Sequence, residues 1–154
     1  MEKKYYLAYG SNLNVRQMRS RCPGAKPIGI TVIPDHELLY KGSKTGAYLT
    51  IESKPGSLVP VAVWEVTPFD ERCLDVYEGY PRFYYKRELR LPVKLANGKT
   101  KQLTAFVYIM HEERKLGIPS PAYIRCCEEG YSDFGFDTKY LNAAYEISAK
   151  EGLK

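Results

Sequence analysis

A chain of 154 residues with 44% apolar and 27% charged residues has the size and composition of one globular domain, expected here over residues 1–154. No apolar run approaches the roughly 18 residues that cross a bilayer, and the start, Met-Glu-Lys-Lys, does not resemble an export signal, so we expect a cytoplasmic protein with no membrane partner. The formal net charge is +5, but the basic residues are interspersed with carboxylates along the chain, which argues against a nucleic-acid partner.

Residues that could hold a metal ion are few. The chain contains Cys22, Cys73, Cys126, Cys127, His36 and His111. The cysteines lack the paired C-x2-C spacing of a zinc site, and vicinal cysteines rarely bridge each other, so we expect reduced thiols. We therefore predict no metal site.

The first elements predicted along the chain are a short buried strand, a glycine loop and a helix. The strand covers Tyr5 to Tyr9, and Asn14 can cap a helix that Pro23-Gly24 ends. The segment from Lys26 to Tyr40 is rich in strand-forming residues but interrupted by two prolines, and Lys41 to Gly46 favours a turn.

Two more strands and a capped helix follow. Residues 47–52 alternate between apolar and polar side chains, as in a half-buried strand, and Leu58 to Val66 is apolar on both faces, as in a central strand. Thr67-Pro68 places an N-cap residue before a proline, which predicts a helix start. This helix is expected to end at Gly79.

The second half of the chain predicts a hairpin and two helices. Strands over residues 83–95 and 103–110 are separated by Asn97-Gly98, a pair typical of a type I′ turn. A capped helix is expected from Ser120 to about Gly130, and an amphipathic helix over residues 140–147.

These elements, six or seven strands with short helices between hairpins, predict an α+β domain whose mostly antiparallel sheet curls toward a small barrel. The sequence lacks a G-x-G-x-x-G string, a P-loop, a nucleophile elbow and a Cys/His pair. Among enzymatic functions, this leaves chemistry performed by a carboxylate.

Three separated segments carry the candidate site. They are Tyr9-Gly10-Ser11-Asn12-Leu13, Tyr77-Glu78-Gly79 and Pro119-Ser120-Pro121-Ala122-Tyr123. A glycine loop that follows a strand and opens a helix presents backbone N–H groups to an anion. The other two segments add a carboxylate and a phenol.

The order and spacing of these segments, over about residues 5–131, resemble those of the γ-glutamylcyclotransferase-like (AIG2-like) family. The resemblance implies a small mixed β-barrel surrounded by helices. It also implies an enzyme of the acyltransferase or lyase type that converts γ-glutamyl amides or amines into 5-oxoproline and a free amine. By the same resemblance Glu78 is the acid/base, the loop from Tyr9 to Leu13 binds the glutamyl group, and Tyr123 lines the pocket.

The chemistry can also be argued from the substrate. A γ-glutamyl amide carries its own nucleophile, the α-amine, so the reaction needs neither a covalent nucleophile nor a cofactor. One carboxylate can move both protons if its pKa lies nearer neutrality than about 4.3. Glu78 sits at the end of a predicted helix among Tyr77, Tyr80 and Phe83, and both the helix end and the aromatic surroundings should raise its pKa.

Further side chains are assigned supporting roles. Ser11 and Asn12 can add side-chain hydrogen bonds to the substrate, and Arg16 can assist in binding its carboxylate. The Tyr123 hydroxyl is expected to contact either the Glu78 carboxylate or the developing oxyanion.

Two other kinds of function stay open at this point. The chain could be a non-catalytic binding module for a γ-glutamyl-like small molecule, and whether Glu78 faces the cavity beside Gly10 would help to decide this. A tyrosine-rich sheet could instead stack single-stranded nucleic acid, but that requires a row of exposed aromatics along a positive groove. The leaving amine is not determined; residues 35–46 and 111–118 are expected to border the mouth of the pocket.

Overall fold

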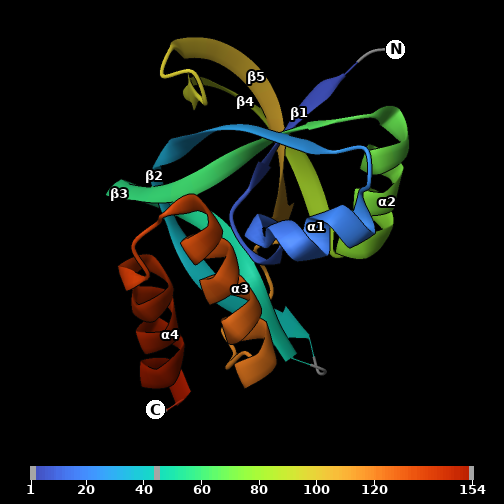
Figure 1. Ribbon diagram of the computed structural model, residues 1–154. Coiled ribbons are helices and arrows are strands. Elements are labelled where there is room, and N and C mark those ends of the chain that lie inside the picture. The colour runs from blue at the N-terminus through green and yellow to red at the C-terminus, as the bar shows by residue number, and fades with distance from the viewer. Residues whose placement is uncertain (1–2, 44–45, 153–154) are drawn as a thin grey trace.

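The computed structural model describes residues 3–43 and 46–152, and their strands close into one barrel (Figure 1). The strands are β1 (Lys4–Ala8), β2 (Lys26–Ser43), β3 (Gly46–Val66), β4 (Tyr84–Leu95) and β5 (Thr100–Met110). Their order around the barrel is β1-β3-β2-β4-β5. Neighbouring strands are antiparallel except β1 and β5, which close the barrel in parallel where Tyr6 lies opposite Phe106.

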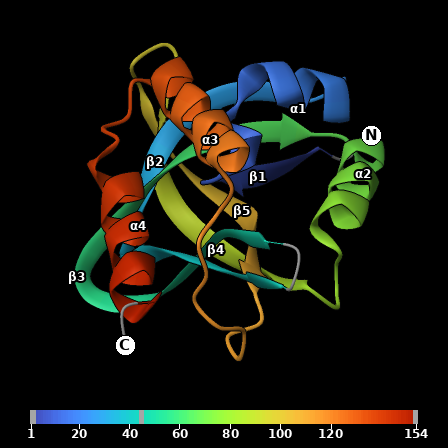
Figure 2. The same cartoon turned by 90° about the horizontal axis from the view of Figure 1, so that it is seen from below.

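Short helices surround the barrel, and the predicted α+β barrel class is confirmed. They are the 3₁₀-helix η1 (Ser11–Leu13), α1 (Val15–Arg21), α2 (Pro68–Glu78), α3 (Pro121–Phe134) and α4 (Lys139–Gly152). Figures 1 and 2 show α3 and α4 on one side of the barrel, with α1 and α2 on another. Within the described ranges, no helix is long and apolar enough to span a membrane.

The described chain forms five strands rather than six or seven, because two prolines bend strand β2 without ending it. The pairing of β2 with β3 shifts register between Pro27 and Gly29 and again between Pro34 and His36. A bulge tolerates proline because the missing N–H falls outside the regular ladder. The expected interruptions are therefore irregularities within one strand.

The two strands expected over residues 47–52 and 58–66 are likewise one, since β3 continues through the residues between them. Strand structure also extends through Lys41–Ser43 and resumes at Gly46, where the sequence favoured a loop. Residues 44 and 45 of that expected loop lie outside the described residues. The long β2–β3 hairpin is consequently the largest paired surface of the barrel.

The start and end of α2 are as predicted, and they place Glu78. The Thr67 hydroxyl accepts a hydrogen bond from the Asp70 N–H at 3.1 Å, and the Asp70 carboxylate accepts one from the Thr67 N–H at 3.1 Å. This reciprocal capping fixes the first turn. At the other end Gly79 adopts the left-handed region, with φ 65°, which makes Glu78 the last helical residue.

The hairpin between β4 and β5 is confirmed, but its turn is not type I′. The Gly98 N–H donates to the Leu95 carbonyl at 2.9 Å, and the Leu95 N–H donates to the Lys99 carbonyl at 2.8 Å. Gly98 has φ 84°, whereas Asn97 is not among the residues with positive φ, and type I′ requires both. The loop is a three-residue connection whose glycine takes the left-handed position.

Helix α3 continues past Gly130, where the sequence suggested its end, and stops at Gly135, which has φ 71°. Gly130 has a packing role instead. A Cβ atom there would lie 2.7 Å from the Leu13 Cβ and 2.7 Å from the Asn14 nitrogen. The absence of a side chain lets α3 pack directly on η1, and this contact holds the glycine loop against the barrel.

Candidate active site

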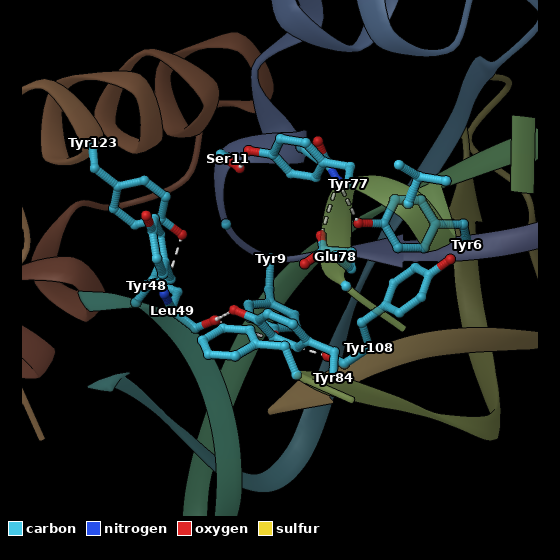
Figure 3. A pocket seen from close by; sticks show the side chains of 15 residues that line it. Tyr6, Tyr9, Ser11, Tyr48, Leu49, Tyr77, Glu78, Tyr84, Tyr108 and Tyr123 are labelled. Carbon is cyan, nitrogen blue, oxygen red and sulfur yellow. Dashed lines mark hydrogen bonds between the residues drawn. The ribbon is translucent and has the colours of Figure 1, made fainter. Parts of the chain in front are cut away.

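A cavity of ≈ 460 Å³ opens at the end of the barrel next to η1, and all three predicted segments reach it (Figure 3). Gly10, Ser11 and Asn12 line it from the glycine loop, Glu78 from the end of α2, and Tyr123 from α3. Aromatic side chains make up much of the remaining wall, namely Tyr6, Tyr9, Tyr48, Tyr77, Phe83, Tyr84 and Tyr108. A cavity of this size accommodates a small molecule.

The Glu78 carboxyl belongs to the wall of this cavity and is bound by the glycine loop. The Asn12 Nδ2 donates a hydrogen bond to Glu78 Oε1 at 3.3 Å. Burial raises the pKa of Glu78 to about 8, against a smaller lowering by the Arg21 guanidinium. Burial favours the neutral form of a carboxyl, as the aromatic surroundings predicted. Near neutral pH this group can therefore both accept and release a proton.

The Asn12 side chain is fully engaged by protein groups. It is 2% exposed, and its Nδ2 also donates to the Tyr6 hydroxyl at 2.9 Å. Its Oδ1 accepts a hydrogen bond from the Arg21 guanidinium. The sequence suggested that this amide binds the substrate; in the structure its hydrogen bonds go to Tyr6, Glu78 and Arg21.

The backbone of the glycine loop leaves several amides without protein acceptors. The Leu13 N–H donates to the Gly10 carbonyl at 3.0 Å, and the Asn14 N–H donates to the Ser11 carbonyl at 3.1 Å. The amides of Gly10, Ser11 and Asn12 have no such acceptor within the described residues. Leu13 does not line the cavity; its side chain is fully buried beneath the loop.

Gly10 lies close to the opposite wall of the cavity. A Cβ atom at this position would lie 3.3 Å from the Tyr123 hydroxyl oxygen and 3.5 Å from the Leu49 Cβ. The Tyr123 hydroxyl accepts a hydrogen bond from the Leu49 N–H at 3.1 Å. Figure 3 shows Tyr123 and Glu78 on different sides of the cavity, so the contact considered between this phenol and this carboxylate is not present.

Other tyrosines tie the base of the cavity to the barrel backbone. The Tyr9 hydroxyl donates to the Tyr108 carbonyl at 2.7 Å, and the Tyr84 hydroxyl donates to the Leu49 carbonyl at 2.8 Å. Burial raises the pKa of Tyr9 and Tyr84 well above the ordinary value, so both stay neutral. On the loop side, the Ser11 and Tyr77 hydroxyls are hydrogen-bonded at 2.9 Å.

Among the basic residues of α1, Arg21 approaches the site and Arg16 does not. The Arg16 side chain is 74% exposed and pairs with Glu129 at 3.2 Å. Arg21 stacks on Tyr77, with 3.5 Å between its guanidinium carbon and the ring centroid. Sequence reasoning missed Arg21. The one signal available was its i, i+4 spacing from Gln17, which places the two side chains on the same face of the helix.

Sequence reasoning also missed Tyr6, Tyr84 and Tyr108 as lining residues. By alternation Phe83 and Tyr85 share one strand face with Leu89, and Tyr84 falls on the other, where an ordinary strand face explains it equally well. In the structure Tyr84 is 5% exposed, whereas Tyr85 is only half-buried. Alternation alone does not identify the inner face at a strand end where the barrel twists.

No described residue of the two segments expected to border the mouth lines the cavity. Tyr48 and Phe83 line the cavity, and their rings meet edge to face with 6.3 Å between the centroids. Arg114, from the second expected segment, packs against Phe83, with its guanidinium carbon 4.2 Å from the ring centroid. No group of three potential metal ligands occurs among the residues that the structure describes.

The fold and the cavity define the class of this protein as a small closed β-barrel with a carboxyl at the wall of a tyrosine-rich pocket. The model of one family, "Gamma-glutamyl cyclotransferase, AIG2-like", matches residues 6–125. The chain belongs to this family, which confirms the resemblance found in the sequence.

Curated relatives carry the same name. The human protein "Gamma-glutamylcyclotransferase" is 30% identical over 146 residues, which cover 90% of this chain and 76% of the relative. The protein of the same name from Bos taurus is 28% identical over 157 residues, covering 97% of this chain and 81% of the relative.

Solved structures agree with the fold. A structure named "Gamma-glutamyl cyclotransferase" superposes with a TM-score of 0.79 at 27% identity, covering 93% of this chain and 86% of the other. A yeast cyclotransferase described as specific to glutathione has a TM-score of 0.57 at 13% identity, covering 97% of this chain and 99% of the other. At that identity the likeness concerns the fold alone.

Proposed function

We propose that this protein is a γ-glutamylcyclotransferase, which converts a γ-glutamyl amino acid or γ-glutamyl amine into 5-oxoproline and a free amine. Membership of the family supports the reaction class. The observation that carries the proposal is the Glu78 carboxyl, whose pKa burial raises to about 8, on the wall of a cavity that Gly10, Ser11 and Asn12 of the glycine loop also line. A proton-transfer group and an anion-binding loop in one small cavity are what this cyclisation requires.

The reaction is an acyl transfer within the substrate. The α-amine nitrogen attacks the γ-carbonyl carbon and forms the C–N bond of a five-membered ring. Glu78 in its ionised form takes a proton from this nitrogen and delivers it to the leaving nitrogen as the original amide bond breaks. Water is not consumed, and the proton balance closes without a cofactor. A pKa near the working pH suits a single group to both transfers.

The glycine loop is assigned to the glutamyl portion of the substrate. The amides of Gly10, Ser11 and Asn12 can donate to the substrate α-carboxylate, because a 3₁₀-helix leaves its first N–H groups unpaired. Tyr9 and Leu13 support the loop from beneath, as their buried side chains indicate. Tyr123, across the cavity, completes the binding surface and is available to the γ-carbonyl oxygen.

The test is release of 5-oxoproline by the purified protein from a panel of γ-glutamyl amino acids and γ-glutamyl amines. We expect turnover of at least one substrate, and its loss in Glu78→Gln, which keeps the shape of the side chain and the acceptor for Asn12. The matched control is Glu129→Gln, which changes a carboxylate paired with Arg16 outside the cavity. This control should retain activity.

Two results would contradict the proposal. Full activity in Glu78→Gln would remove the proton-transfer role. Binding of γ-glutamyl compounds by the unaltered protein, with no 5-oxoproline from any of them, would instead establish the non-catalytic binding module. The position of Glu78 on the cavity wall beside Asn12 favours catalysis over binding alone.

A further inference from the structure

Arg21 connects three parts of the candidate site without lining the cavity itself. It is the last residue of α1, and its planar guanidinium stacks on the Tyr77 ring of α2 at 3.5 Å. One nitrogen donates to Asn12 Oδ1 in the glycine loop, and another donates to Gln17 Oε1 at 3.0 Å. The C-terminal end of a helix also favours a positive charge. Arg21 is therefore held in a defined orientation from several sides.

This contact determines which way the Asn12 amide points. A guanidinium only donates hydrogen bonds, so the group that faces Arg21 must be the amide oxygen. The amide nitrogen then faces the other side, where it donates to Glu78 Oε1 at 3.3 Å and to the Tyr6 hydroxyl at 2.9 Å. With the amide reversed, its oxygen would face the Glu78 carboxylate and repel it.

We propose that Arg21 is a positioning residue of this site, which acts through Asn12 to hold the Glu78 carboxyl in place and to stabilise its ionised form. The kinetic part of this inference rests on the proposed function. The part that concerns the ionisation of Glu78 does not, because it can be measured without a substrate.

The other titratable groups that face Glu78 are neutral near pH 7. They therefore add no charge that would offset the effect of Arg21 on the ionisation of Glu78. They are tyrosines whose pKa burial raises, namely Tyr6, Tyr9, Tyr77, Tyr84, Tyr108 and Tyr123. Within the described part of the chain, the charge that acts on the Glu78 carboxyl is that of Arg21, and it lowers the pKa that burial raises.

The first experiment follows the Glu78 carboxyl by ¹³C NMR through a pH titration, with the signal assigned by its loss in Glu78→Gln. We expect Arg21→Gln to raise the pKa of Glu78 above its value in the unaltered protein. Arg21→Lys keeps the charge and should stay closer to that value. Arg16→Gln, on the same helix but paired with Glu129 at the surface, should leave the titration unchanged.

The second experiment is a double-mutant cycle on turnover. Arg21→Gln should lower kcat at pH 7 by about tenfold to a hundredfold, the range expected when a reacting group is misplaced by about 1 Å. Arg21→Lys should recover part of this loss. In the Asn12→Ala background, Arg21→Gln should have little further effect, because its route to Glu78 has been removed.

Independent effects of Arg21→Gln and Asn12→Ala on kcat would overturn the route through Asn12. A Glu78 titration identical in Arg21→Gln and the unaltered protein would overturn the inference as a whole. Should Arg21→Gln not fold, the same titration on Arg21→Met, which removes the charge and keeps an apolar stem beside Tyr77, decides the question. If the unaltered protein forms no 5-oxoproline while the titration shifts as expected, the proposed function fails and the positioning role of Arg21 stands.

Discussion

Replacing Glu78 by glutamine should change how the stability of the protein depends on pH. In the folded protein burial raises the pKa of Glu78 from 4.5 to about 8, whereas in the unfolded chain the group titrates at its ordinary value. Below pH 4.5 the carboxyl is protonated in both states and contributes no difference. As pH rises toward 8 the unfolded chain releases its proton first, so the folded state loses stability over this window.

The magnitude follows from the two pKa values. Each pKa unit corresponds to about 1.4 kcal/mol, so the full difference would amount to about 5 kcal/mol above pH 8. Glu78 is half-buried rather than fully enclosed, and solvent screening reduces this figure. We expect the unaltered protein to lose about 2–3 kcal/mol relative to Glu78→Gln between pH 5 and pH 9.

Urea unfolding at several pH values provides the assay. Trp64 is the single tryptophan of the chain and is 1% exposed, so its fluorescence reports loss of the core. Taking the difference between the variant and the unaltered protein at each pH cancels the titration of groups that they share.

The expected result is a difference near its smallest at pH 5 that grows in favour of Glu78→Gln toward pH 9. A difference that stays constant across this range would refute the reasoning, because it would mean that Glu78 titrates alike in the folded and unfolded states. A difference that shrank with rising pH would show a carboxyl stabilised by its surroundings rather than desolvated.

Three further outcomes are expected. The activity of the unaltered protein, measured as kcat/KM for 5-oxoproline release, should rise with pH through a midpoint near 8, since Glu78 must be ionised to accept the amine proton; a flat profile from pH 6 to 9 would argue against this. Tyr123→Phe should keep its ring but lose the acceptor for the Leu49 N–H, and we expect turnover to fall about tenfold; an unchanged rate would remove the hydroxyl from the site. Gly130→Ala should lower the free energy of unfolding, measured in urea, by about 1–3 kcal/mol, because the alanine Cβ would lie 2.7 Å from the Leu13 Cβ. Unaltered stability would show that α3 can move away from η1 without cost.

Features decided by neighbouring residues in the sequence were predicted well. Asn14, Thr67 and Ser120 each cap a helix, because a side-chain oxygen there reaches the N–H of a residue three positions later. The same local logic ended α2 at Gly79. These signals also mark where the motif segments begin or end. The sequence alone therefore suffices to place Glu78 at a helix end.

Features decided by contacts between distant segments were not. Gly130 looked like a helix end, and only the approach of η1 reveals that it is a packing site. Arg16 and Arg21 are both basic residues of one short helix, and their different roles depend on which face turns toward α2. Tyr84 illustrates the same limit in a strand, because barrel twist decides which of two adjacent tyrosines points inward.

The backbone of Leu49 is a shared anchor, since its N–H donates to the Tyr123 hydroxyl and its carbonyl accepts from the Tyr84 hydroxyl. An anchor made of main chain does not depend on which side chain stands at position 49, proline excepted, so the two phenols keep their attachment when the sequence changes there. Among the described residues, no hydrogen bond attaches the Tyr48 or Phe83 side chain to the backbone. These rings rest on aromatic edge contacts and, for Phe83, on the Arg114 guanidinium. Efforts to change which small molecule the pocket accommodates should therefore begin with these two rings and leave the tethered phenols intact.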